Sequence, residues 1–367
     1  MKKIVIEKVR KEFGELVAVD GLDLGVEEGE FMSLLGPSGC GKTTTLNMIM
    51  GYEKPTCGKV YIDGKVANDV PVGKRGVGMV FQDYAIFLHM TVFENLAFAL
   101  RVRKVPDDQV KAEVEKMALI LGLSALLQEP AGNRNMSELQ RIAIGRSLMV
   151  QASILLLDEP LSNLDADLRS KMRGELKKFQ LELDQTMIYV THDQVEAMSL
   201  SDRIAVMDLG RLQQFDTPYD IYNHPVNVFV ATFIGSPPMN LMEGEMRTVG
   251  DRMVFKNPSV QCDLTAYKTQ LEKKLRSRMV LFGIRPEHVE VLASKDKGLV
   301  DGTVCELEPM GSDVATVLEC NHERIMALTK PEHVPEIGVT RAVNFNLTKM
   351  HLFDKESGSR IDVRLDS

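Results

Sequence analysis

Residues 31–43 read FMSLLGPSGCGKT. The first five form a short, mainly apolar run, which is typical of a buried parallel strand. The next eight match the pattern GxxxxGK[ST], in which glycines allow main-chain N–H groups to close around phosphates. The segment therefore predicts a strand, a phosphate-binding loop and a helix within an α/β domain.

Each position of this phosphate-binding loop has an expected role. Lys42 would neutralise phosphate charge, and the Thr43 hydroxyl would ligate Mg²⁺. Cys40 is expected to be only a small loop residue. The residues expected to surround the bound phosphates are Gly36, Pro37, Ser38, Gly39, Cys40, Gly41, Lys42, Thr43 and Thr44.

A second buried strand is predicted at residues 154–157, ILLL, and it ends in Asp158 and Glu159. The carboxyl ends of strands in an open α/β sheet are where ligands bind, so these two carboxylates are expected beside the phosphate-binding loop. Asp158 would hold Mg²⁺, and Glu159 would polarise the water that attacks the nucleotide.

Apolar spacing predicts the organisation of the remaining chain. Helical spacing between residues 91 and 127, followed by a helix at 137–150, indicates a helical insert of about 91–150. Further buried strands at 187–190 and 204–207 continue the β–α alternation. The first domain, residues 1–235, is therefore expected to be an α/β sheet domain.

A second domain, residues 236–367, is expected after the Gly-Ser-Pro-Pro cluster at 235–238, because adjacent prolines favour extended chain. Short β-like segments follow at regular spacing, which predicts a small β-barrel or sandwich. These segments lie around residue 254 and at 280–282, 289–291, 314–317 and 342–345.

Composition excludes several classes of protein. A length of 367 residues suggests two or three domains, and 44 basic against 52 acidic residues give a net charge of −8, so no nucleic-acid partner is expected. Five cysteines without CxxC spacing indicate neither a disulfide framework nor a zinc site. The chain has no signal peptide pattern and no apolar run of about 18 residues, so any membrane role would require a partner.

Five motifs in order resemble those of the ATPase subunits of ABC transporters. They are the phosphate-binding loop at 36–43, Gln82 in VFQ, the strand and carboxylates at 154–159, the segment SNLD at 162–165, and THD at 191–193. The resemblance implies that ATP and Mg²⁺ are the cofactors and that the fold is a P-loop ABC-type nucleotide-binding domain with a helical insert.

The resemblance also assigns roles to single residues. Phe13 would stack on adenine, unless it is a core phenylalanine. Gln82 would sense Mg²⁺ and the attacking water and would link the site to a membrane partner. His192 would contact the γ-phosphate, which makes Glu159, His192 and Gln82 the expected catalytic residues. Asp165 would bridge to a second subunit, and it could also cap a helix.

The second domain is similar to that of the carbohydrate-importer branch of the family. The similarity lies in residues 235–240, 283–288 and 351–353, and it implies an OB-like barrel with a regulatory and dimerising role. The implied function is ATP-driven import of a sugar, polyol or glycerol phosphate. The implied partners are a second ATPase subunit, in a homodimer or a heterodimer, the transmembrane permease subunits and, indirectly, a solute-binding protein. The chain would then be peripheral, at the cytoplasmic face of a bacterial cell membrane.

The signature motif LSGGQ of this family is altered here, because the segment reads NRNMSELQR at 133–141. An ungapped alignment puts Asn135 at the signature serine, with Met136 and Ser137 at the glycines. An alignment that deletes both glycines instead makes Ser137 the signature serine and a nucleotide contact. Either alignment places a Cβ where the main chain approaches phosphate closely.

Two alternatives to an importer ATPase stay open. One is a soluble, non-transport ABC ATPase, which would need a coiled-coil insertion, zinc-type cysteine pairs or basic arms that the sequence lacks. The other is a non-hydrolysing or heteromeric subunit that binds ATP structurally. Glu159 and His192, both intact, argue against the second alternative.

Overall fold

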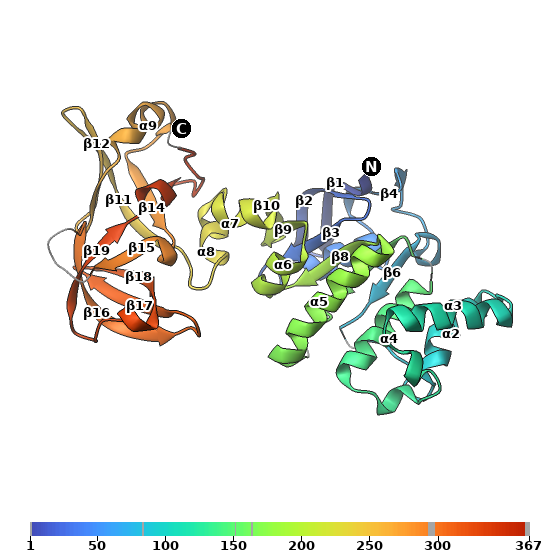
Figure 1. Cartoon of the computed structure of the whole chain (residues 1–367). Coiled ribbons are helices and arrows are strands. Elements are labelled where there is room, and N and C mark those ends of the chain that lie inside the picture. Colours follow the sequence, from blue (N-terminus) through green and yellow to red (C-terminus); the bar gives the residue numbers. More distant parts are fainter. Residues whose placement is uncertain (1, 83, 151, 163, 293–297, 364–367) are drawn as a thin grey trace. The chain divides into compact units, whose positions relative to one another are not determined.

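A computed structural model describes residues 2–82, 84–150, 152–162, 164–292 and 298–363. The chain forms two compact units, Met1–Asp220 and Ile221–Ser367, which are described one by one (Figure 1). The sequence placed the boundary between the domains later, after residue 235.

The first unit is built on a six-stranded sheet with strand order β10-β9-β3-β8-β7-β6. Five neighbouring strands are parallel, and β10 is antiparallel to β9. This arrangement confirms the predicted α/β fold and each of the four strands expected in this sheet. The strands are β3 (Phe31–Leu35), β6 (Val77–Val80), β7 (Ile154–Asp158), β8 (Thr186–Thr191), β9 (Arg203–Asp208) and β10 (Arg211–Asp216).

An antiparallel sheet, with order β2-β1-β4-β5, and helix α1 (Lys42–Met50) pack against one face of the six-stranded sheet. Leu34 and Ile188 of the large sheet share this core with Ile4 of the small sheet and Leu46 of α1. Both faces of β3 and β8 are buried, and their sequences, FMSLL and TMIYVT, are mainly apolar between the terminal residues of β8. The strands of the small sheet are β1 (Lys2–Phe13), β2 (Leu16–Glu27), β4 (Cys57–Ile62) and β5 (Lys65–Val66).

Helices contribute to a second core on the opposite side of the large sheet, where α5 lies against the sheet and α2, α3 and α4 gather beside β6 (Figure 1). Capping boxes begin two of them, with Thr91 and Glu94 at α2 and with Asn135 and Glu138 at α4. The predicted helical insert therefore contains separate helices, and a longer segment with two 3-10 turns connects α3 to α4. The helices of this face are α2 (Val92–Val102), α3 (Asp107–Ile120), α4 (Met136–Leu148) and α5 (Ala166–Leu183), and the shorter α6 (Gln194–Leu200) follows β8.

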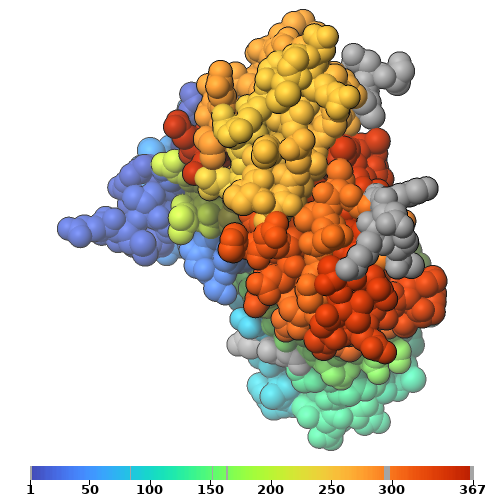
Figure 2. All heavy atoms as spheres, turned by 90° about the vertical axis from the view of Figure 1, so that its left-hand side faces the viewer, coloured from blue at the N-terminus to red at the C-terminus, as the bar shows by residue number. Residues whose placement is uncertain are grey.

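The second unit contains two five-stranded antiparallel sheets, with orders β13-β12-β11-β14-β20 and β15-β19-β16-β17-β18. One apolar core is shared by both sheets, which fits the expected OB-like barrel. Figure 2 shows this unit with its earlier strands in yellow and its later strands in orange and red. The elements are α7 (Pro218–Asn223), α8 (Val228–Phe233), β11 (Asn240–Val249), β12 (Arg252–Lys256), β13 (Gln261–Asp263), α9 (Lys268–Lys274), β14 (Met279–Ile284), β15 (Val289–Leu292), β16 (Val300–Pro309), β17 (Val314–Cys320), β18 (Glu323–Thr329), β19 (Thr340–Phe345) and β20 (His351–Asp354).

A buried arginine attaches the first residues of this unit to its sheets. Arg285 follows β14 and is only 2% exposed. Its Nε and Nη2 donate to the carbonyl of Tyr222, and its Nη1 donates to the carbonyl of Ile234. The guanidinium also lies 3.7 Å from the centroid of the Tyr222 ring. Residues 222–234 are therefore fixed to the end of β14.

Arg285→Ala is expected to lower the free energy of unfolding of the second unit by about 3 kcal/mol, because the buried Ile234 carbonyl and the partly buried Tyr222 carbonyl lose their donors. The exposed Arg278→Ala is the matched control, and we expect a change within about 0.5 kcal/mol. Scanning calorimetry of the whole chain measures both changes. Equal unfolding midpoints for the two variants would contradict the role of Arg285.

Candidate functional site

The phosphate-binding loop connects β3 to α1, as the sequence predicts. Gly41 has a φ of 99°, and a Cβ there would lie 2.4 Å from the carbonyl oxygen of Ala18 in β2. Only glycine fits such a close approach with a left-handed main chain. No side chain caps the N-terminus of α1, so its first N–H groups are available to an anion.

Lys42 supplies the positive charge of this loop. The residue is buried, and its Nζ donates to the carbonyls of Gly36 at 2.7 Å and Pro37 at 2.9 Å. These acceptors are neutral, so they solvate the ammonium without cancelling its charge. Cys40 is buried beside it, and burial raises the pKa of its thiol, which agrees with a small, uncharged loop residue. The loop is therefore suited to hold a polyanion such as a nucleotide phosphate chain.

Thr43 and Asp158 meet where β3 and β7 end. Thr43 Oγ1 donates to Asp158 Oδ1 at 3.4 Å. Burial raises the pKa of the Asp158 carboxyl and the charge of Glu159 adds to the rise, while Thr43 and the Lys42 ammonium oppose it. A hydroxyl and a carboxylate fit Mg²⁺, which commonly takes one or two protein carboxylates and completes its shell with phosphates and water. Among the described residues, no group of three or more His, Cys, Asp or Glu side chains could hold a metal ion.

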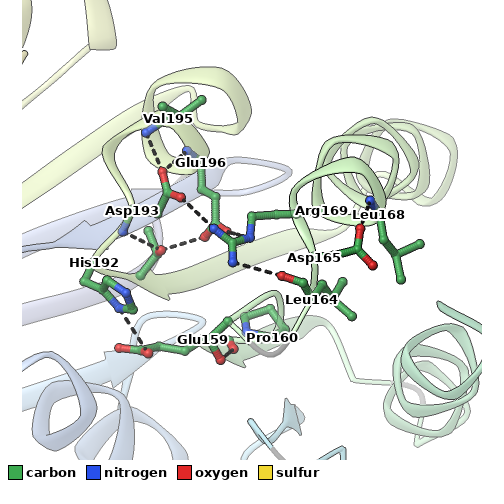
Figure 3. A network of polar contacts seen from close by, with 12 residues as sticks. Glu159, Pro160, Leu164, Asp165, Leu168, Arg169, His192, Asp193, Val195 and Glu196 are labelled. Atoms are coloured by element: carbon green, nitrogen blue, oxygen red, sulfur yellow. Dashed lines mark hydrogen bonds and ion pairs between the residues drawn. The ribbon is translucent and has the colours of Figure 1, made fainter. Parts of the chain in front are cut away.

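Glu159 and His192 face each other across the site (Figure 3). His192 Nδ1 lies 3.2 Å from Glu159 Oε2. The two residues follow β7 and β8, which are adjacent and parallel, so their loops emerge side by side. Glu159 has a left-handed main chain with a φ of 45°, held by its N–H donating to the carbonyl of Val190 at 3.0 Å. Such a conformation is costly for glutamate and is typical of functional sites.

Gln82, Phe13 and Asp165 occupy three further positions around the loops. Gln82 Nε2 donates to Ser162 Oγ at 3.3 Å, beside the segment that follows Glu159. Phe13 ends β1 and is 44% exposed, so it is not a core residue, and Lys11 Nζ lies over its ring, 4.6 Å from the centroid. Asp165 caps α5 by accepting from the N–H of Leu168 at 2.9 Å, while Asn163 of the same motif lies outside the described residues.

The altered signature segment forms the start of α4. Asn135 is its N-cap, and its Oδ1 accepts from the N–H of Glu138 at 2.9 Å. Ser137 lies inside the first turn, where its Oγ is 3.2 Å from Met172 Sδ of α5. Asn135 and Met136 are exposed at the helix start, whereas the Ser137 hydroxyl faces a neighbouring helix. In the ungapped alignment, the residue at the position of the signature serine, Asn135, is therefore the N-cap of α4.

One part of the site has no counterpart in the sequence motifs. Arg169, in the first turn of α5, contacts Leu164, Asp193 and Glu196 (Figure 3). A single arginine on a charged helix normally indicates a solvated face, so no sequence signal identified it. The side chain is instead 30% exposed and directed into the polar network beside His192.

Three segments of the chain match known families. Residues 19–162 match the family described as ABC transporter, residues 235–289 match the MalK OB fold domain, and residues 282–353 match the TOBE domain. Two examples of solved structures that resemble the chain follow. A post-hydrolysis dimer of the ATP-binding cassette MJ0796 with ADP and Pi is 29% identical, with a TM-score of 0.52, over 59% of this chain and 98% of that one. The cbiO1 protein of Clostridium perfringens is 26% identical, with a TM-score of 0.56, over 60% of this chain and 90% of that one.

Curated relatives match over nearly their whole length. The trehalose/maltose import ATP-binding protein MalK of Thermococcus litoralis is 42% identical over 98% of this chain and 100% of the relative. The sulfoquinovosyl glycerol transport ATP-binding protein SmoE of Agrobacterium fabrum is 40% identical over 96% of this chain and 98% of the relative. The sn-glycerol-3-phosphate import ATP-binding protein UgpC of Pectobacterium atrosepticum is 39% identical over 99% of this chain and 100% of the relative.

Asp158→Asn is expected to stabilise the nucleotide-free, Mg²⁺-free protein near neutral pH. The folded protein holds the Asp158 pKa above that of the unfolded chain, so ionisation of this carboxyl opposes folding as the pH rises through the raised pKa. The gain in unfolding midpoint should therefore be largest at about pH 7 and should shrink as the pH falls into the ordinary titration range of aspartate.

Thermal unfolding over a pH series measures this difference, with the exposed Asp251→Asn as the control. An Asp158→Asn variant that is less stable than the unsubstituted protein at neutral pH would show that the carboxylate is not under electrostatic strain.

Proposed function

This chain belongs to the ABC transporter family, and from that premise we propose that it is the ATP-hydrolysing subunit of a carbohydrate importer. The observation that carries the proposal is the 3.2 Å approach of His192 to Glu159 beside the Lys42 loop. A subunit that held ATP only as a structural ligand would need the loop but not this carboxylate and histidine. The match to importer ATPases over nearly the whole chain supports the same activity.

The proposed chemistry uses few side chains. The N-terminus of α1 and the Lys42 ammonium hold the phosphate chain of ATP. Glu159 accepts a proton as the oxygen of water attacks the γ-phosphorus and the bond to the ADP oxygen breaks. His192 orients the γ-phosphate and the attacking water at Glu159. Mg²⁺ held by Thr43 and Asp158, with Gln82 as a further ligand, would neutralise charge on the phosphates.

The second subunit is proposed to complete the site. Asn135 at the start of α4 would face the γ-phosphate bound to the other subunit, and Asp165 would approach the same interface. Asn135 Oδ1 accepts from the N–H of Glu138, and the main-chain N–H of Asn135 donates to the Glu138 carboxylate, so the side-chain Nδ2 would be the group that donates to the phosphate. Homodimer and heterodimer both remain compatible with this geometry, and Phe13 would stack on adenine in either.

The proposed solute is a sugar, a polyol or a glycerol phosphate. The names of the three relatives cover trehalose and maltose, sulfoquinovosyl glycerol and sn-glycerol-3-phosphate. The nucleotide site cannot select among these solutes, so selection would lie in permease subunits and a solute-binding protein.

The permease is proposed to dock at a cavity of about 450 Å³ in the first unit. Phe81, Phe98 and Val102 line it with mostly apolar surface, and Arg146 adds a charge. Phe98 and Val102 are 39% and 67% exposed, and Phe81 directly precedes Gln82. A permease helix end docked here would be adjacent to the proposed catalytic loops. No helix among the described residues has the length and apolar character to cross a membrane.

Glu159→Gln is expected to lower the rate of ATP hydrolysis of the chain in complex with its permease about 100-fold or more, because the proton acceptor is lost. ATP binding should persist, since Lys42 and the loop are unchanged. The exposed Glu113→Gln of α3 is the matched control. The test measures phosphate release and nucleotide binding on reconstituted complexes. Undiminished release by Glu159→Gln would contradict the role of Glu159 as the proton acceptor.

Phe98→Glu is expected to reduce solute transport about tenfold by placing an unpaired charge in an apolar docking surface. Phosphate release by the isolated chain should stay within about twofold, because the cavity is separate from the phosphate-binding loop. Leu119→Glu, on the exposed face of α3 and outside the cavity, is the control. Equal transport by the two variants would exclude the cavity as the docking site.

A further inference from the structure

A single guanidinium connects the two loops that carry Glu159 and His192 (Figure 3). Arg169 Nη2 donates to the carbonyl of Leu164 at 3.0 Å, at the far end of the segment that begins with Glu159. Arg169 Nη1 donates to Asp193 Oδ2 at 3.3 Å, and Asp193 directly follows His192. The two loops are therefore connected at the Glu159–His192 contact and again through Arg169.

Asp193 connects the His192 loop to the neighbouring helix and strand as well as to Arg169. Its Oδ1 caps α6 by accepting from the N–H groups of Val195 at 2.8 Å and Glu196 at 3.2 Å. Its own N–H donates to Thr191 Oγ1 at 3.0 Å, at the end of β8. Asp193 therefore uses Oδ1 to cap helix α6 and Oδ2 to accept from Arg169.

A buried carboxylate lies beside the guanidinium. Glu196 is 3% exposed and accepts from Tyr189 Oη at 2.8 Å and from Thr191 Oγ1 at 2.6 Å. Burial, reinforced by the Glu196 charge, raises the pKa of Tyr189 well above its ordinary value, so the phenol remains a donor. Arg169 Nε lies 3.8 Å from Glu196 Oε1 and supplies the nearby positive charge that a buried carboxylate requires.

We propose that Arg169 is a positioning residue for ATP hydrolysis, which fixes the Glu159 loop relative to the His192 loop; this inference rests on the proposed function. Arg169 acts through Leu164 and Asp193 and not by touching the reacting atoms. The planar guanidinium is suited to the role because it donates in several directions at once, whereas a lysine ammonium is a single point charge on a flexible stem.

The first test compares Arg169→Gln with Arg173→Gln, a control one turn further along α5. We expect Arg169→Gln to lower kcat about tenfold or more while the KM for ATP stays within about twofold, because misplaced loops affect the transition state more than the bound phosphates. Arg169→Lys should recover less than about half of kcat, since it restores charge but not the two-sided contact. A kcat for Arg169→Gln equal to that of Arg173→Gln would overturn the proposal.

A second test uses Asp193→Asn, which keeps the helix cap and removes only the charge that faces Arg169. We expect this variant to lower kcat as well, and the double variant with Arg169→Gln to be no slower than about the slower single variant, because both changes break one connection. Additive losses would mean that the two residues act separately, and would overturn the proposal.

Amide hydrogen exchange of the nucleotide-free chain tests the connection without any turnover. Exchange should rise in Arg169→Gln within residues 161–162, 164–168 and 192–196 and stay at the control level elsewhere in the described part of the first unit. Unchanged exchange in these segments, or a rise throughout the unit, would overturn the positioning role. If the unsubstituted protein releases no phosphate, the proposed function fails, and the exchange pattern still decides whether Arg169 holds the loops together.

Discussion

The site depends on the close main-chain contacts of the phosphate-binding loop. A Cβ at Gly36 would lie 2.3 Å from the carbonyl oxygen of Met207 in β9, and a Cβ at Gly41 would lie 2.4 Å from that of Ala18 in β2. The loop is thus clamped between the six-stranded sheet and the antiparallel sheet, and no larger residue could occupy either position. This clamp orients the start of α1, and with it Lys42, toward the ends of the parallel strands.

The order of the parallel strands brings Asp158, Glu159 and His192 close to this loop. Because β3, β8 and β7 are neighbours, the segments that follow them emerge at one edge, where Thr43 reaches Asp158 and His192 reaches Glu159. Arg169, in the first turn of helix α5, contacts both the segment that follows β7 and the segment that follows β8. Residues from four separate parts of the sequence therefore share one small region of the first unit.

Much of this arrangement could be predicted from the sequence, and the exceptions have physical reasons. Strands β3 and β7 were predictable because they are buried on both faces and read as apolar runs. Strands such as β11 and β16 were not predicted, because four of the ten residues in each are exposed and the alternation is irregular. The signature serine could not be assigned from the sequence alone, because both alignments fit the letters; the structure adds that Asn135 caps α4 and that the Ser137 hydroxyl faces α5. Arg169 belongs to no motif, and only the fold brings it to Asp193.

The most direct test asks whether this geometry hydrolyses ATP despite the altered signature. It measures phosphate release from Mg-ATP by the purified, unsubstituted chain, without a permease, over a range of protein concentrations. We expect release that rises more steeply than linearly with protein concentration, because a second copy would complete each site. ATP binding without any phosphate release at every concentration would contradict hydrolysis by this chain alone and would indicate a different partner subunit or a structural nucleotide.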